Sequence, residues 1–304
     1  MSPESKLIFL TGVGRSGTTL LQSMMHAHPD MCFGTETHFF KKVIIHTQLR
    51  GCKIKGLDLL KLIRDNKIQE RTALDLSGIR SEEILDLESL RRMFIGILEA
   101  ACPGSPVIGD KDTEYVRYVP HLKFHFPDAY LIQIVRDPRD VLTSRKKAGW
   151  SKNTLTAFHA AEYQFYMERL PDWGKKSFGE RYISLRYEDL ISDPEQELRK
   201  LCDKLGIDFQ GSMLHYHEQN ADLVAGDERE WKENVFKPVI SGNSGKWKDS
   251  LSSRELGMVE IGYEDQMQEW GYEVDGNGRL NYLDRLLREA YRFALMRKTQ
   301  RESI

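Results

Sequence analysis

Short apolar segments alternate along this chain with segments in which apolar residues recur at helical spacing. Residues 7–11, 106–109, 130–135 and 181–185 are strand candidates, and YLIQIV at 130–135 is the clearest because nearly every residue is apolar or β-branched. A long amphipathic helix is expected at 81–101. The alternation predicts an α/β fold with a central parallel sheet and helices on both faces.

Two helix starts are well marked in the second half of the chain. Asp193 can cap a helix with Pro194 at its first position and Gln196 three residues after the cap. Ser252 with Glu255 forms a second capping box, which predicts a helix running to about residue 270. Both signals lie outside the strand-rich part of the chain.

The remaining pattern bears on domain organisation. Residues 207–250 lack clear periodicity and are expected to form a long, partly irregular segment over the site. No linker divides the 304 residues, so we expect one domain over 1–278 with a C-terminal helical extension over 279–304. Leu283, Leu286, Leu287, Ala290, Tyr291 and Ala294 share one stripe of that extension, and we expect this stripe to pack on the domain. The alternative is a basic amphipathic helix that binds a membrane or a partner.

Composition narrows the class of protein further. Lys and Arg number 44 and Asp and Glu number 46, so the net charge of −2 gives no general attraction to nucleic acid. The longest apolar runs fall well short of a transmembrane segment. Four cysteines lie far apart, which argues against a metal cage, and a chain of this size needs no disulfide framework. We therefore expect a cytoplasmic protein without transmembrane segments.

A glycine-rich loop follows the first strand. Gly12-Val13-Gly14-Arg15-Ser16-Gly17-Thr18-Thr19 stands between a predicted strand and a predicted helix, where backbone N–H groups and the helix N-terminus can bind one anion. The spacing matches a nucleotide-binding P-loop, but Thr18 stands where a nucleoside-triphosphate enzyme has Lys, and Arg15 supplies the cation. Phosphate or sulfate binding is expected rather than ATP or GTP hydrolysis.

A second anion site is expected after the clearest strand. Arg136 follows that strand directly, at the sheet edge where ligands gather in open parallel sheets. Ser144 lies eight residues further on, on the helix that Asp137 and Pro138 begin. An Arg and a Ser placed in this way can hold one phosphate from two sides.

The motifs together resemble a known family. GVGRSGTTLLQSMMHAHPD followed by GTETHFF resembles the phosphosulfate loop of sulfotransferases that use 3′-phosphoadenosine 5′-phosphosulfate (PAPS), and is most similar to the tyrosylprotein-type members. The resemblance implies the P-loop-like sulfotransferase fold. It further implies that Arg15 to Thr19 hold the 5′-phosphate and sulfate, and that Arg136 and Ser144 hold the 3′-phosphate. Adenosine 3′,5′-bisphosphate (PAP) would be the product, and no metal is implied.

Two later segments support the resemblance. Arg186-Tyr187-Glu188-Asp189-Leu190 resembles a family segment whose Tyr approaches the adenine, which implies that role for Tyr187. Gly242-Asn243-Ser244-Gly245-Lys246-Trp247 resembles the family's late loop, which closes over the 3′-phosphate. The resemblance therefore implies that Gly245, Lys246 and Trp247 contact the nucleotide.

The chemistry of sulfuryl transfer needs a base for the acceptor hydroxyl and a cation for the leaving group. Glu36 matches the family's Gly-x-Glu-Thr segment and is the expected base. Lys111 matches the family's Lys-Asp segment and is the expected acid or charge stabiliser. His38 is a rival base on its intrinsic pKa, and it stands where the tyrosylprotein enzymes have Arg.

The cysteines mark another departure from the family. The Golgi tyrosylprotein enzymes place disulfide partners just before the Glu and Lys segments, at positions that Phe33 and Gly109 occupy here. Cys32 lies next to the first position, but no cysteine flanks Lys111. We therefore expect that this disulfide cannot form, in agreement with a reducing compartment.

The sequence leaves several alternatives open. A P-loop nucleotide kinase and a non-catalytic nucleotide-binding protein are the competing functions, and a homodimer stays open. The acceptor could be a carbohydrate, a lipid, a small-molecule hydroxyl or a tyrosine.

Overall fold

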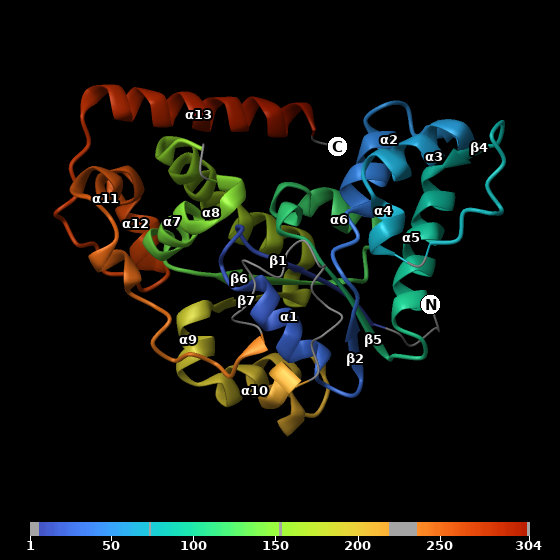
Figure 1. Cartoon of the computed structure of the whole chain (residues 1–304), viewed down its shortest axis with the longest axis horizontal. Helices are drawn as coiled ribbons and strands as arrows, with labels where there is room; N and C mark the ends of the chain where they lie inside the picture. The colour runs from blue at the N-terminus through green and yellow to red at the C-terminus, as the bar shows by residue number, and fades with distance from the viewer. Residues whose placement is uncertain (1–5, 73, 152–153, 219–235, 303–304) are drawn as a thin grey trace.

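A five-stranded parallel sheet forms the centre of the molecule (Figure 1). The computed structural model describes residues 6–72, 74–151, 154–218 and 236–302. The strand order is β2 (Met31–Phe33), β5 (Val107–Lys111), β1 (Lys6–Thr11), β6 (Tyr130–Val135) and β7 (Tyr182–Arg186). All neighbouring pairs run parallel, so the carboxyl ends of the strands meet at one edge. The predicted α/β architecture is confirmed.

The central strand β1 shows why the chain needs helices on both sides. Leu7 and Phe9 enter one hydrophobic core, whereas Ile8 and Leu10 enter a second core on the opposite face. Side chains alternate along a strand, so a run that is apolar at every position must be covered twice. The first core is rich in aromatic rings, and Phe9 alone packs against four other rings.

The helices and a small second sheet surround this core. In chain order the α-helices are α1 (Thr18–His26), α2 (His46–Gln48), α3 (Gly56–Asp65), α4 (Ile68–Arg71), α5 (Leu87–Ala101), α6 (Val119–His125), α7 (Pro138–Lys147), α8 (Thr156–Phe178), α9 (Tyr187–Ser192), α10 (Pro194–Leu205), α11 (Ser253–Glu260), α12 (Glu264–Glu269) and α13 (Tyr282–Arg301). Residues of α1, α9 and α10 line the second core, and residues of α5, α6 and α8 line the first. A π-helical turn spans Phe40–Ile45.

Most predicted elements are present with shifted ends, and two differ in kind. The helix expected from residue 81 begins at Leu87, because residues 84–86 form strand β4 (Ile84–Asp86), which pairs with β3 (Lys53–Lys55). The helix expected to run to about residue 270 is broken into α11 and α12 at Gly262, which has a φ of 77°. The caps at Asp193 and Ser252 are confirmed. The irregular segment was expected at 207–250, and its residues 219–235 lie outside the described residues.

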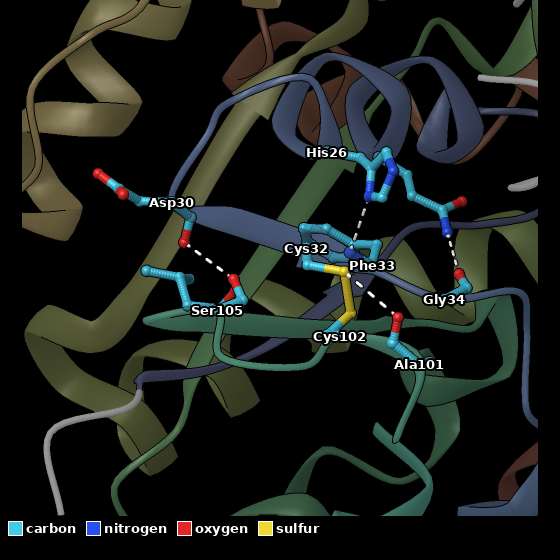
Figure 2. The surroundings of a disulfide bond; sticks show 10 residues. His26, Asp30, Cys32, Phe33, Gly34, Ala101, Cys102 and Ser105 are labelled. Atoms are coloured by element: carbon cyan, nitrogen blue, oxygen red, sulfur yellow. Dashed lines mark hydrogen bonds between the residues drawn. A yellow bond between two sulfur atoms is a disulfide. The ribbon is translucent and has the colours of Figure 1, made fainter. Parts of the chain in front are cut away.

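A disulfide joins Cys32 to Cys102, so the expectation that no disulfide forms in this region is wrong (Figure 2). Cys32 lies in β2, and Cys102 ends α5 just before the chain turns back into β5, the strand beside β2. The two Cα atoms are 5.5 Å apart, although 70 residues separate them along the chain. The cytoplasmic location stays a prediction, and the disulfide removes the cysteine pattern as a reason for it.

The C-terminal helix α13 packs on α8 and α11, along the upper edge of the molecule in Figure 1. Its predicted stripe does not pack as expected. Tyr291 contacts the ring of Phe158, but Leu283, Leu286 and Leu287 are exposed. None of the helices in the described part of the chain has the length and apolar content that crossing a bilayer requires.

Candidate active site

The glycine-rich loop turns sharply between β1 and α1 at the carboxyl edge of the sheet. Gly17 has a φ of 99°, and a Cβ there would lie 2.4 Å from the Tyr187 ring. A Cβ at Gly12 would lie 2.5 Å from the carbonyl oxygen of Ile134. Glycine is therefore required at both positions, because the loop must approach β6 and α9 closely.

Arg15 projects from this loop toward α7. Its Nε donates a hydrogen bond of 3.0 Å to the Ser144 Oγ, which joins the two predicted anion motifs. Burial and the nearby cations Arg136 and Arg145 lower the pKa of Arg15. Several guanidinium groups held together in this way favour the binding of an anion between them.

Arg136 links the loop to the late segment of the chain. Its Nη1 donates to the Arg15 carbonyl oxygen at 3.2 Å, and its Nη2 donates to the Asn243 carbonyl oxygen at 3.0 Å. The guanidinium lies 4.3 Å from the centre of the Tyr187 ring. Asn243 in turn donates to the Tyr187 hydroxyl at 2.6 Å and accepts from the Lys246 Nζ at 2.5 Å. Arg136, Tyr187 and Lys246, predicted from three separate motifs, thus form one cluster.

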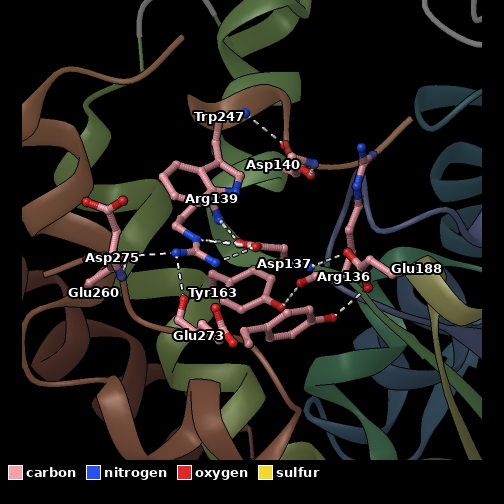
Figure 3. A network of polar contacts seen from close by, with 12 residues as sticks. Arg136, Asp137, Arg139, Asp140, Tyr163, Glu188, Trp247, Glu260, Glu273 and Asp275 are labelled. Carbon is pink, nitrogen blue, oxygen red and sulfur yellow. Dashed lines mark hydrogen bonds and ion pairs between the residues drawn. The ribbon is translucent and has the colours of Figure 1, made fainter. Parts of the chain in front are cut away.

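Asp140 anchors the late loop to α7 (Figure 3). Its carboxylate accepts hydrogen bonds from the backbone N–H of Gly245 at 2.7 Å and of Trp247 at 3.0 Å. The Trp247 ring stacks on the Arg139 guanidinium at 3.9 Å, and Arg139 pairs with Asp137 and Glu260. The backbone N–H groups of Gly245 and Trp247 therefore hold the loop in place on α7.

A cavity of about 310 Å³ opens where these elements meet. Four cationic side chains line it, those of Arg15, Arg136, Lys147 and Lys246. Two buried polar atoms of the lining residues, Arg136 Nε and Thr143 Oγ1, and the Ser16 Oγ in the adjoining loop have no hydrogen-bond partner within the described ranges. Buried polar atoms are normally satisfied, so unpaired donors beside four cations mark a site built for an anionic ligand.

The other predicted loop residues lie beside this cavity. Gly14 accepts a hydrogen bond of 3.2 Å from the Arg145 Nε through its carbonyl oxygen. Thr18 and Thr19 begin α1, where backbone N–H groups have no partner within the helix. Thr18 is buried and Thr19 is half-buried.

Glu36 and Lys111 form a buried ion pair at the same edge of the sheet. Lys111 is the last residue of β5 and lies opposite Leu10 of β1. Leu10 precedes the start of the glycine-rich loop by two residues. Its side chain is only 1% exposed, and that of Glu36 is 12% exposed. The strand pairing therefore brings together two residues that the sequence suggested separately.

Contacts from α1 fix the segment that carries Glu36. The Phe33 N–H donates to the His26 Nδ1 at 3.1 Å, and the Gln22 Nε2 donates to the Gly34 carbonyl oxygen at 2.8 Å (Figure 2). The disulfide holds the same strand from the other side. The turn after β2 is thus restrained two residues before Glu36.

His38 is held against Asp112 beside the ion pair. Its Nδ1 lies 2.8 Å from the Asp112 Oδ2, and its φ of 54° places it in the left-handed region. Burial alone would lower the pKa of His38, but the hydrogen bond to Asp112 and that carboxylate's charge outweigh it, so the pKa is raised. His38 is thereby oriented as well as charged over a wider pH range.

Comparison with known proteins places this geometry in a family. A model of the sulfotransferase family matches residues 8–211, which include the loop, Glu36, Lys111 and Arg136. The chain belongs to the sulfotransferase family. Human protein-tyrosine sulfotransferase 1 is 30% identical over 256 residues, which are 80% of this chain and 64% of that protein. The Drosophila melanogaster protein-tyrosine sulfotransferase is 28% identical over 259 residues, which are 80% of this chain and 47% of that protein.

The coverage values limit which properties of these relatives can be compared with this chain. The chain spans between about half and two thirds of the length of these two curated relatives. Among solved structures, the sulfotransferase domain from the curacin biosynthetic pathway matches with a TM-score of 0.63 at 19% identity, covering 89% of this chain and 99% of that domain. The sulfotransferase domain from the Synechococcus PCC 7002 olefin synthase matches with a TM-score of 0.62 at 20% identity, covering 89% and 96%. The predicted sulfotransferase fold and family are confirmed.

Sequence reasoning missed three residues of this sulfotransferase site. Lys147 lines the cavity three residues after Ser144, so it lies on the same face of α7 and could have been found from helical spacing. Asn243 joins Arg136, Tyr187 and Lys246, but no signal in the sequence distinguishes it from an ordinary loop residue. Asp112 follows Lys111 directly and orients His38.

One group of side chains near the ion pair has the composition of a metal site. Ligand atoms of Glu36, His38 and Asp112 lie within 4.8 Å of one another. Glu36 is paired with the Lys111 ammonium and His38 with Asp112, and an ammonium beside the cluster opposes a second cation. The charges of these side chains are thus satisfied by one another and by Lys111.

Proposed function

We propose that this chain transfers a sulfuryl group from PAPS to an acceptor hydroxyl. The observation that carries the proposal is the cationic cavity with unpaired buried Ser16 Oγ, Arg136 Nε and Thr143 Oγ1, next to the Glu36–Lys111 pair. An anion-binding cavity and a buried acid–base pair at one sheet edge are the two parts that such a transfer needs. Membership in the sulfotransferase family agrees with both.

The residues present fit the donor that the family uses. Arg15, Ser16, Gly17, Thr18 and Thr19 would hold its 5′ end through backbone N–H groups, the hydroxyls and one guanidinium. Arg136 and Ser144, joined by Lys147 and Lys246, would hold its 3′-phosphate. PAPS supplies an activated sulfuryl group when it is bound.

Glu36 and Lys111 have different roles in the transfer step, one as proton acceptor and the other as a source of positive charge. Glu36 takes the proton of the acceptor hydroxyl, because a neutral alcohol or phenol is a poor nucleophile. Lys111 places positive charge at the oxygen that leaves the sulfur. Their ion pair holds both side chains at the sheet edge before an acceptor arrives.

His38 is a second candidate for the base, and one contact favours it. Asp112 holds the His38 Nδ1, as an acid holds the imidazole in an oriented general base. If Glu36 is the base, we expect His38→Asn to lower kcat about tenfold and Glu36→Gln to lower it far more. A larger loss in His38→Asn, together with loss of the limb of the pH–rate profile that requires a neutral imidazole, would assign the base to His38.

Tyrosine is the acceptor that we propose to test first. The relatives that match this chain carry the name protein-tyrosine sulfotransferase. Carbohydrate, lipid and small-molecule hydroxyls belong in the same panel. The acceptor identity, a homodimer and a cytoplasmic location remain proposals.

A transfer assay tests the proposal directly. The full chain is incubated with radiolabelled PAPS and, in turn, a tyrosine peptide, a simple phenol, a monosaccharide and a sterol. We expect label on at least one acceptor, and its loss in Lys111→Met. Lys204→Met, at an exposed position on α10, is the matched control and should keep full activity. Equal activity in wild type and Lys111→Met would contradict the proposal.

A further inference from the structure

The outer face of α13 is apolar over most of its length. Tyr282, Leu283, Leu286, Leu287 and Phe293 are five of the eleven large apolar side chains exposed in the described part of the chain. Leu283 is 74% exposed and Phe293 is 55% exposed. Leu283, Leu286, Ala290 and Phe293 follow a spacing of three, four and three residues, so they form one continuous stripe. A stripe of this kind on a soluble domain marks an interaction surface.

The contacts on the inner face explain why this stripe points outward. Asp284 pairs with Arg254, and Arg292 pairs with Glu168 on α8. The Arg288 Nη1 donates to the carbonyl oxygens of Met258 and Ile261. These charged groups fix the rotation of the helix about its axis, so its leucines cannot turn toward the domain.

The last turn of the same outer face is basic. Arg297, Lys298 and Arg301 are exposed and follow the apolar stripe. The acids on and next to this helix are already engaged: Asp284 by Arg254, Glu289 by Arg288 and Arg292, and Glu302 by Arg117. Arg297 lies over the Phe293 ring at 5.6 Å, so cation and apolar surface are in contact. The face thus offers apolar side chains over about three turns and three positive charges at one end.

The charges on the outer face of α13 indicate which kind of partner can bind there. Two copies of α13 packed antiparallel would place the basic turn of each against leucines of the other, and packed parallel they would bring cation against cation. Neither arrangement provides an acid for Arg297, Lys298 and Arg301 within the described residues. An anionic lipid surface complements both the apolar stripe and the basic last turn. Its acyl chains cover the stripe, and its headgroup phosphates pair with the cations.

We propose that the outer face of α13 binds the surface of an anionic membrane, with the helix lying in the plane of the interface. This mode needs no transmembrane segment, since an interfacial helix buries only one face. Apolar burial and basic residues together give reversible but specific attachment. The proposal is independent of the transferase activity.

Vesicle flotation of the full chain tests this surface. The probes are vesicles of phosphatidylcholine alone and vesicles of phosphatidylcholine and phosphatidylserine in equal amounts. We expect binding to the second kind that is at least about tenfold stronger than to the first and weakens as salt is raised. No binding to the phosphatidylserine vesicles, or equal binding to both kinds, would overturn the proposal.

Matched variants locate the contact. Leu286→Ser with Phe293→Ser should reduce binding at least about tenfold, and Lys298→Gln with Arg301→Gln should reduce it about fivefold per charge. Phe124→Ser on α6 and Lys176→Gln on α8 change exposed residues of the same types elsewhere and should bind like the wild type. An equal loss in these controls would overturn the proposal. So would self-association that the α13 variants abolish while vesicle binding is absent.

Discussion

The donor region and the transfer region lie side by side at one sheet edge, and their charges are arranged in opposite ways. Four cations and one acid, Asp140, line the cavity, and the Asp140 carboxylate already accepts two backbone N–H groups. Buried donors of Ser16, Arg136 and Thr143 lack partners within the described residues. Around Glu36, two cationic groups are held by acids, Lys111 by Glu36 and His38 by Asp112. The first region is thus incomplete without an anion, whereas the second is neutralised by its own side chains.

The difference separates binding from chemistry in physical terms. Clustered cations attract a multiply charged ligand strongly and account for affinity. Paired charges add little attraction for the donor but hold a proton acceptor and a cation in fixed positions. Variants in the two regions should therefore affect different measurements.

The largest effect is expected from Glu36→Gln, which removes the proton acceptor and keeps the shape of the side chain. We expect kcat to fall about a thousandfold, because general base catalysis contributes factors of this size. The affinity for PAP should stay within about twofold of wild type by calorimetric titration. A parallel loss of affinity and kcat would mean that the two regions are not separable at Glu36.

The disulfide should matter nearly as much for stability. Replacing both Cys32 and Cys102 by Ala opens a loop closed over 70 residues, which the chain-entropy estimate puts at about 4 kcal/mol of unfolding free energy. Urea unfolding of the variant and the wild type gives the difference. Because the bond anchors the strand before Glu36, kcat should fall while PAP affinity is retained. Unchanged urea midpoints would show that β2 and β5 are held by packing alone.

Asp110, the residue before Lys111, should make the unfolding free energy depend on pH. Burial raises the pKa of Asp110 to about 7, against an ordinary value of 3.8. Between these values the folded chain holds a proton that the unfolded chain has released, so the unfolding free energy should fall as pH rises from about 4 to 7. The fall is on the order of 3 kcal/mol. Asp110→Asn should flatten the pH profile measured by urea unfolding, and an unchanged slope would contradict this assignment.

Arg136→Ala tests the donor region alone. Removing a charged donor to a phosphate should weaken PAP binding about thirtyfold, equivalent to about 2 kcal/mol. Arg186→Ala is the control, since Arg186 ends the neighbouring strand β7 but stacks on Tyr272, away from the cavity lining. Its affinity for PAP should match the wild type. Equal losses in both variants would point to a general effect of strand-end cations.

The sequence predicts those parts of the site whose residues lie close together along the chain. The donor loop is one contiguous motif, and Arg136 directly follows a clearly apolar strand, so the local pattern is enough to predict both. The pairing of Glu36 with Lys111 needs β2 beside β5, and the Cys32–Cys102 bond needs that order as well as the reversal after α5. Strand order is a long-range property that no local spacing contains. Family resemblance supplied the two residues, but it led to the wrong expectation that no disulfide forms beside them.

The orientation of α13 shows another limit. Periodicity correctly identified its apolar stripe, and the natural expectation was that the stripe packs inward. The helix is instead oriented by Asp284, Arg288 and Arg292, whose partners lie on α11, in the segment that follows it, and on α8. Such partners become visible only when the fold is known, because each charged residue alone is indistinguishable from a solvated one.

Thermal unfolding with three nucleotides tests directly whether the cationic cavity binds PAP or a nucleoside triphosphate. PAP, ADP and Mg-ATP are added separately, at matched concentrations, to the full chain. We expect Tm to rise selectively with PAP and without a metal. A ligand at one hundred times its Kd raises the unfolding free energy by about 2.7 kcal/mol. A rise with Mg-ATP alone would contradict this expectation and would make a nucleotide kinase the better description of this site.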